Sequence, residues 1–183
     1  RVARSSSALR LPLTLAAALL AASTAARAQA PARVSYAPAG WDAGTKLREA
    51  VDINPDPNIV EINLTAKVAD VEVAPGKKVT AWTYDGGLPG PLIRTKVGNR
   101  LIVHFKNELD ASTTVHWHGV RLNIEMDGVP GISQPPVKKG ETFTYDFIVP
   151  DASLYWYHPH VLSNAQVGFG LYGALLVEDP DDP

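Results

Sequence analysis

From Ile59 onward, apolar and polar residues alternate along short segments, and this period of two constrains the fold more than any other feature of the chain. The pattern is clearest over residues 60–64 and 101–105, where every second residue is apolar. Successive side chains of a β-strand point to opposite faces of a sheet, so such a segment buries one face and exposes the other. We therefore expect a chain built from half-buried strands rather than from helices.

Segments with this pattern, or with a short apolar run, recur along the chain and are separated by turn residues. They span residues 59–73, 79–84, 92–97, 100–107, 113–118, 142–149, 154–158 and 171–178. The 15 prolines and 14 glycines suit many short strands joined by turns. Strands at this spacing predict an all-β fold, an antiparallel β-sandwich with Greek-key connections.

The N-terminal residues 1–30 are predicted to be a secretory signal peptide. Arginines precede an apolar stretch over residues 11–26, and Ala28-Gln29-Ala30 matches the A-x-A cleavage pattern. The apolar run is short for a membrane span and contains Pro12. We expect cleavage after about Ala30, a periplasmic or secreted location, an irregular leader over 31–58, a domain over 59–179, and the start of an interdomain linker over 180–183.

Composition excludes several classes of function. Beyond residue 30, 13 basic and 19 acidic residues remain, a formal charge of −6. An acidic domain without a Lys/Arg cluster is a poor partner for nucleic acid or an anionic membrane, so we expect neither as a partner. The chain contains no cysteine. This excludes disulfides, zinc–thiolate sites and a blue-copper electron-transfer centre, whose copper needs a thiolate ligand.

Four of the five histidines form two H-x-H pairs, His116 with His118 and His158 with His160. Residues i and i+2 of a strand share a face, with Cα atoms roughly 6.5–7 Å apart. Each pair is therefore expected to aim two imidazoles into one space. Imidazole binds copper, zinc and iron, so the spacing leaves open a copper site, a zinc hydrolase and a cupin-like iron site. His104 lies opposite the apolar face of its segment and is predicted to be a sheet-surface residue outside the site.

Short motifs around these histidines resemble the multicopper oxidase family, which includes laccases, bilirubin oxidases and ferroxidases. They are LPGPLI at 88–93, VGNRL at 97–101, TVHWHG at 114–119, MDGVP at 126–130, QPP at 134–136, YWYHPH at 155–160, QV at 166–167, GLYG at 170–173 and LVED at 176–179. HWHG followed by WYHPH at this distance is a highly specific combination. The resemblance covers about residues 60–179; it implies a cupredoxin-like Greek-key sandwich and favours copper over zinc.

The resemblance also implies roles for single residues. In the family, two domains share a three-copper cluster and each gives four histidines. His116 would bind the type 2 copper, and His118 with His158 would bind one copper of the type 3 pair. His160 would bind the other type 3 copper. Asp127, in the MDG motif, would assist proton delivery, although Asp-Gly is also a strong turn pair and a purely structural role is the alternative.

The chain is therefore expected to be the first domain of a multicopper oxidase that oxidises a phenol, an amine or a metal ion and reduces O2 to water. The other ligands and the type 1 copper would come from a C-terminal cupredoxin domain of the same protein or of a neighbouring subunit. The chain alone is expected to be inactive. Two other classes stay open: a non-catalytic periplasmic copper-binding or copper-storage protein, and an adhesion-type sandwich with incidental histidines.

Overall fold

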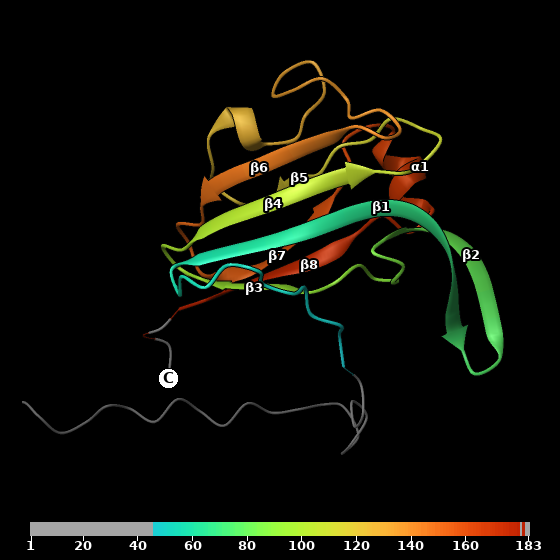
Figure 1. Ribbon diagram of the computed structural model, residues 1–183, viewed down its shortest axis with the longest axis horizontal. Helices are drawn as coiled ribbons and strands as arrows, with labels where there is room; N and C mark the ends of the chain where they lie inside the picture. Colours follow the sequence, from blue (N-terminus) through green and yellow to red (C-terminus); the bar gives the residue numbers. More distant parts are fainter. Residues whose placement is uncertain (1–45, 180, 182–183) are drawn as a thin grey trace, which may run out of the picture. The chain divides into compact units, whose positions relative to one another are not determined.

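The computed structural model describes residues 46–179 and residue 181. These residues form two four-stranded sheets, with strand orders β2-β1-β4-β6 and β3-β8-β7-β5 (Figure 1). The elements are β1 (Ile59–Ala74), β2 (Lys77–Tyr84), β3 (Ile93–Lys96), β4 (Arg100–Asn107), β5 (His116–His118), η1 (Ile124–Met126), β6 (Thr142–Ile148), β7 (Ser153–His158), α1 (Ser163–Gly168) and β8 (Gly173–Glu178). The all-β sandwich that the sequence predicts is confirmed.

The predicted signal peptide lies outside the described residues, as does the predicted leader up to residue 45. The remaining part of that leader, residues 46–58, has no regular strand or helix but is bonded to the sandwich. The Ala50 N–H donates to the carbonyl oxygen of Leu92 at 2.9 Å, and the Ile53 N–H donates to that of Glu61 at 2.8 Å. Neither helix of the described residues has the length and hydrophobicity of a membrane span.

The core lies between the two sheets and follows the alternation in the sequence. In β1, Ile62 and Leu64 are fully buried, whereas Asn63 between them is exposed. The second sheet contributes Trp117 and Tyr157 to the same cluster, both fully buried. Full burial of a large apolar side chain is worth about 1.5–3 kcal/mol, so each strand is held with a fixed face toward the core.

The predicted antiparallel sandwich is confirmed as a two-sheet sandwich, but two of its strand pairs are parallel. β1 and β2 form an antiparallel hairpin, but β1 runs parallel to β4, and β3 runs parallel to β8. Between β1 and β4 the chain passes through β2 and then through β3 in the other sheet. Neighbours that are not joined by a hairpin turn are free to pair in parallel. Alternation reports which face of a strand is buried and carries no information on strand direction.

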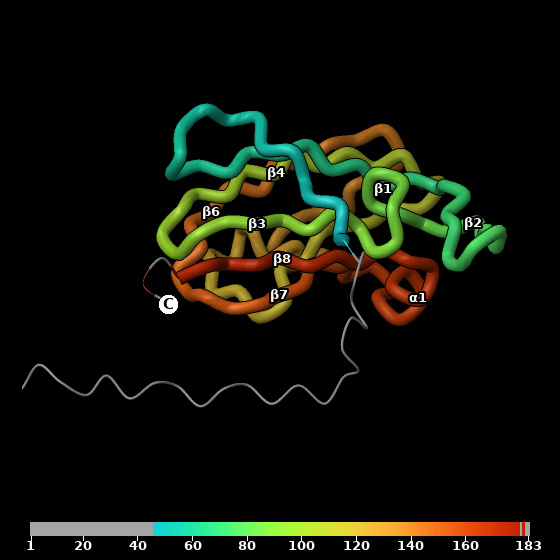
Figure 2. The backbone as a smooth tube through the Cα atoms, turned by 90° about the horizontal axis from the view of Figure 1, so that it is seen from below, coloured from blue at the N-terminus to red at the C-terminus, as the bar shows by residue number. Residues whose placement is uncertain are grey.

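β5 is a three-residue edge strand. It pairs with β7, which pairs on its other side with β8; Figure 2 shows β3, β8 and β7 side by side. The predicted strand over 113–118 is too long, because residues 113–115 lie outside the ladder and Thr113 instead forms an isolated bridge with Val137. The short strand places Trp117 in the core and its two histidine neighbours on the outer face of the sheet.

Candidate metal centre

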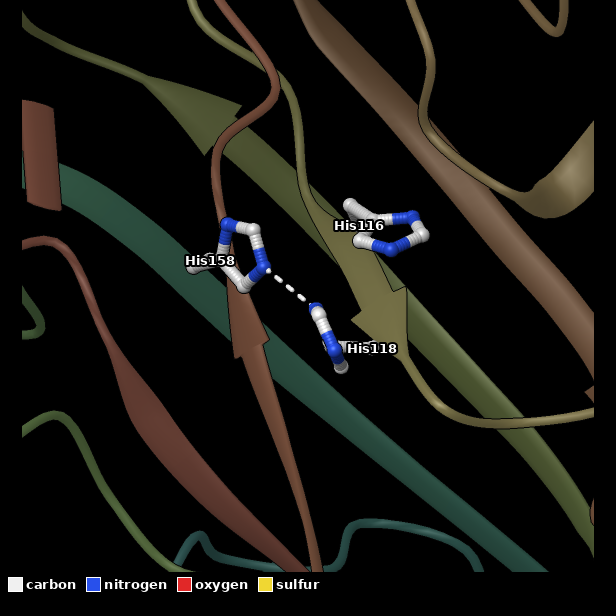
Figure 3. Close-up of side chains that lie close together, drawn as sticks. All are labelled: His116, His118 and His158. Atoms are coloured by element: carbon white, nitrogen blue, oxygen red, sulfur yellow. Dashed lines mark hydrogen bonds between the residues drawn. The ribbon is translucent and has the colours of Figure 1, made fainter. Parts of the chain in front are cut away.

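Three histidines from two adjacent strands converge on the outer face of the second sheet. His116 and His118 belong to β5, and His158 is the last residue of β7. One ring nitrogen from each lies within 4.8 Å of the others (Figure 3). His116 is the register partner of His158, and Trp156 is that of His118. The i, i+2 spacing predicted for the first pair thus produces two imidazoles on one face.

Backbone carbonyl groups fix which ring nitrogens keep a free lone pair. His116 Nδ1 lies 2.7 Å from the carbonyl oxygen of Asp127, and His158 Nδ1 lies 3.0 Å from that of Pro159. A carbonyl oxygen only accepts hydrogen bonds, so both Nδ1 atoms carry the proton. The Nε2 atoms of His116 and His158 are therefore the ones available to a metal ion.

The spacing of His118 and His158 fits two ligands of one ion. His118 Nδ1 lies 3.2 Å from His158 Nε2, and the dashed line in Figure 3 joins them. Imidazole nitrogens bind zinc at about 2.0–2.1 Å, and two such bonds at a tetrahedral ion put the nitrogens roughly 3.3 Å apart. The two rings therefore face each other across a distance that one metal ion can bridge without rearrangement of the strands.

His160 joins the cluster by a different route from the one predicted. β7 ends at His158, because the following Pro159 has no N–H for a ladder hydrogen bond. His160 is therefore not on a strand, and the i, i+2 rule does not place it. Its ring centroid nevertheless lies 4.7 Å from that of His116 and 6.0 Å from that of His158. The prediction that both histidine pairs lie on strands is therefore wrong for the second pair. The ring of His160 nevertheless reaches the region occupied by the rings of His116 and His158.

Desolvation keeps two of the imidazoles neutral. His158 is 5% exposed, and this burial, reinforced by repulsion from the neighbouring histidines, lowers its pKa to about 4. His160 is exposed, but the protein around its ring removes part of its hydration and thereby lowers its pKa, and repulsion from His116 adds to the effect. Because the neutral ring is the form that binds metal, these two side chains are in the ligand form at pH 7.

Asp127 presents both its backbone and its carboxylate to His116. Besides the carbonyl contact, its Oδ1 lies 3.2 Å from His116 Nδ1. The residue ends η1 and precedes Gly128, which has a φ of +72°. A Cβ atom at Gly128 would lie 1.9 Å from the carbonyl oxygen of Val115, so glycine is needed for this loop to approach β5. Asp127 is thus a turn residue and also an acidic group at the edge of the cluster.

His104 lies on the surface of a sheet, as predicted, and this is the sheet that does not contain β5 and β7. It projects from the outer face of β4, where its Nε2 is 2.7 Å from a carboxylate oxygen of Glu61 and its Nδ1 is 3.3 Å from Thr144 Oγ1. Its side chain is 40% exposed. The carboxylate accounts for the position of this ring without a metal ion.

Sequence reasoning missed the polar residues behind the histidines. Thr113, Thr114 and Gln166 are all buried and hydrogen-bonded around the segment that enters β5. Two threonines directly before an H-x-H motif were a visible signal, and Gln166 was part of the family resemblance. Polar residues in irregular segments nevertheless look like solvated loop residues until the fold brings them together.

Comparisons with known proteins agree with this geometry. The family model described as Multicopper oxidase matches residues 65–182. Copper resistance protein A of Pseudomonas syringae pv. tomato is 45% identical over 103 residues, which are 56% of this chain and 17% of that protein. Multicopper oxidase MmcO of Mycobacterium tuberculosis is 41% identical over 124 residues, 68% of this chain and 24% of that protein. The chain thus spans about a fifth of the length of these relatives.

Solved structures show the same relationship. A multi-copper oxidase from Pseudomonas thermotolerans is 48% identical with a TM-score of 0.65, over 68% of this chain and 30% of that chain. A multicopper oxidase from Campylobacter jejuni, described as a metallo-oxidase, is 36% identical with a TM-score of 0.68, over 74% of this chain and 29% of that chain.

The metal that the histidine spacing left open is now decided, and the predicted fold is confirmed. The region that the family model matches contains both histidine pairs. The Multicopper oxidase family binds copper rather than zinc or iron. The two-sheet sandwich is the cupredoxin-like fold of the solved relatives. Since the family model covers more than half of its residues, this chain belongs to the multicopper oxidase family.

Proposed function

We propose that residues 59–179 are the first cupredoxin domain of an exported multicopper oxidase, and that they supply half of the histidines of a three-copper cluster. The observation that carries the proposal is the convergence of three histidine nitrogens within 4.8 Å on an outer sheet face, in a chain of this family. The signal peptide predicted over residues 1–30 would direct the protein to the periplasm or the exterior.

The openness of the face supports a site that is shared with a second domain. His118 and His160 are exposed, although a metal ligand in a complete cluster is shielded from solvent. Trp156, whose ring centroid lies 5.1 Å from that of His118, is 38% exposed, and Leu154, two residues earlier in β7, is 70% exposed. Exposed apolar side chains next to a ligand group are typical of a surface that a partner covers. The partner in this proposal is a C-terminal cupredoxin domain of the same protein or of a neighbouring subunit, which adds the remaining ligands and the type 1 copper.

The ligand geometry supports a division of the histidines among the copper ions. His118 Nδ1 and His158 Nε2 face each other and would hold one copper of the type 3 pair. His160 would hold the other copper of that pair. His116, through the Nε2 that the Asp127 carbonyl leaves free, would hold the type 2 copper. When bound, copper supplies the one-electron chemistry by which a phenol, an amine or a metal ion reduces O2 to water.

Asp127 is the residue of this chain that we propose to move protons. Reduction of O2 to water consumes protons, and the carboxylate lies beside His116 with its side chain 24% exposed. It can therefore take a proton from solvent on one side and release it toward the cluster on the other. The backbone of the same residue orients His116, so the two contributions need separate tests: Asp127→Asn keeps the carbonyl and removes only the acid.

Copper titration of the chain and oxygen uptake by the complete oxidase test the proposal. The chain alone should bind Cu(II) weakly, show no intense blue colour and consume no O2. His116→Ala/His118→Ala should abolish copper binding measured by calorimetry, with an unchanged circular dichroism spectrum. His104→Ala, which removes a histidine from the other sheet, is the matched control and should bind copper normally. Copper binding that survives the double change, or that disappears in the control, would defeat the assignment of the site.

A further inference from the structure

A buried amide behind the cluster has no part in the function proposed above. Gln166 is the buried residue of α1, with 3% of its surface exposed. Burying an amide without hydrogen-bond partners costs several kcal/mol in an apolar medium. The groups that bond to the Gln166 amide therefore indicate its structural role. Its Oε1 accepts a hydrogen bond from Thr113 Oγ1 at 2.8 Å, and its Nε2 donates to the carbonyl oxygen of Ser112 at 3.0 Å. Both partners lie on the segment that leads into β5.

The same segment is bonded to the other histidine pair. Thr114 is fully buried, and its Oγ1 accepts a hydrogen bond from the backbone N–H of His160 at 3.2 Å. Thr114 also stands two residues before His116 in the sequence. One buried threonine therefore connects the segment before the first histidine pair to the last histidine of the second.

β5 needs such support because its own pairing is weak. It has three residues and lies at the edge of its sheet, so few ladder hydrogen bonds define its position. His160 lies beyond the end of β7 and has no ladder of its own. The 4.7 Å separation of the His116 and His160 ring centroids is therefore set by the segments that flank them.

α1 is a firm support for this arrangement, because its C-terminal end is bonded to the other sheet. The N–H of Trp82, on β2, donates to the carbonyl oxygen of Phe169 at 3.0 Å. At Gly170 the backbone lies so close to β2 that a Cβ atom would be 2.6 Å from the carbonyl oxygen of Trp82. The Gln166 amide thus connects a fixed element to the segment that carries the histidines.

We propose that Gln166 is a positioning residue of the copper cluster. Acting through Thr113 and Thr114, it fixes the distance between His116 and His160 and so sets the copper affinity of the chain, without touching the metal. This inference rests on the proposed copper-binding function. Outer-shell groups that orient metal ligands typically change affinity by about 10- to 100-fold when removed, and we expect a loss in this range.

The test is a Cu(II) titration of the 183-residue chain and its variants by calorimetry, with electron paramagnetic resonance spectra of the bound ion. Gln166→Met removes both hydrogen bonds at similar volume. Thr113→Val removes only the hydroxyl, and the matched Thr113→Ser retains it. We expect weakened binding and an altered spectrum in Gln166→Met and Thr113→Val, and the affinity and spectrum of the parent in Thr113→Ser.

Val103→Ala, a core change in β4 of the other sheet, is the control that separates a loss of stability from a loss of copper affinity. It should lower the melting temperature and leave the copper affinity and spectrum unchanged. If Gln166→Met fails to fold, the comparison of Thr113→Val with Thr113→Ser still tests the positioning role. Parental affinity in Thr113→Val, or equal losses in Thr113→Val and Thr113→Ser, would overturn the positioning role. Failure of the parent chain to bind copper would instead refute the proposed function itself, and with it the premise of this inference.

Discussion

Trp117 joins β5 to the core, and its replacement tests whether β5 is held in place by its contacts with the core. The side chain is fully buried and lies between His116 and His118 in the strand. Its ring centroid lies 5.5 Å from that of Tyr145, 5.2 Å from that of Phe147 and 5.9 Å from that of Tyr157. Trp117 is the one buried residue of the three in β5, so it is the side chain that anchors the strand in the core.

The structure predicts different losses of stability for Trp117→Ala and Trp117→Phe. A buried tryptophan removes roughly 150–250 Å² from water, and truncation of such a residue to alanine costs about 3–5 kcal/mol. Trp117→Phe differs because the indole N–H is buried and has no hydrogen-bond partner within the described part of the chain. An unpaired buried donor costs about 1–3 kcal/mol, which phenylalanine recovers. In Trp117→Phe, the free energy lost with the smaller ring and the desolvation free energy recovered nearly cancel. We therefore expect its free energy of unfolding to stay within about 1 kcal/mol of that of the parent.

Urea unfolding of the metal-free chain, followed by circular dichroism, measures both costs. Trp117→Ala should lose at least about 3 kcal/mol and bind copper more weakly, whereas Trp117→Phe should keep both properties. Trp156→Ala, on the outer face of the neighbouring strand, is the control and should cost much less because that ring is 38% exposed. A loss below about 1 kcal/mol in Trp117→Ala, or equal losses in the two Trp117 variants, would refute the reasoning.

Three further predictions follow from the cluster and its supports. Because the pKa of His158 is about 4 in the fold and 6.5 in the unfolded chain, the unfolded chain binds the proton first. The metal-free protein should therefore lose stability as the pH falls from 6.5 to 4, and urea unfolding of His158→Gln should show a smaller loss. Bound Cu(II) should quench the fluorescence of Trp156, whose ring centroid lies 4.0 Å from that of His158, and Trp156→Phe should show clearly less quenching. Gly128→Ala should lower the unfolding free energy by more than about 2 kcal/mol, since positive φ alone costs about 1–2 kcal/mol and the new Cβ would overlap the Val115 carbonyl; an unchanged melting curve would contradict this.

The sequence predicted the parts of the fold that depend on one strand at a time. Ile62 and Leu64 are buried because period-two alternation assigns faces within a single segment. The parallel pairing of β1 with β4 depends on how the chain crosses between sheets, which no segment encodes alone. The helices η1 and α1 were not predicted, since each spans less than two turns and leaves no period to detect.

The same limit applies to the site. His116 and His118 share a face because they belong to one strand, so their convergence was predictable from spacing. His160 reaches the cluster from the irregular segment after β7, which the spacing rule does not cover. The bond between Thr113 and Gln166 joins residues 53 positions apart, so it exists only once α1 has packed behind β5. Predictability thus falls as the number of elements that must meet increases.

β5 is a short edge strand, so two different parts of the chain determine its histidine site. The strand supplies His116 and His118, and the residues around it hold their rings in position. A strand in the middle of a sheet is held by ladder bonds on both sides. An edge strand gives up half of that ladder. β5 replaces the missing half with Trp117 from behind, the Asp127 carbonyl beside His116 and the buried threonines at its start. Metal affinity in this chain should therefore be more sensitive to these supports than the stability of the sandwich is, because β1 and β4 fold against each other without them.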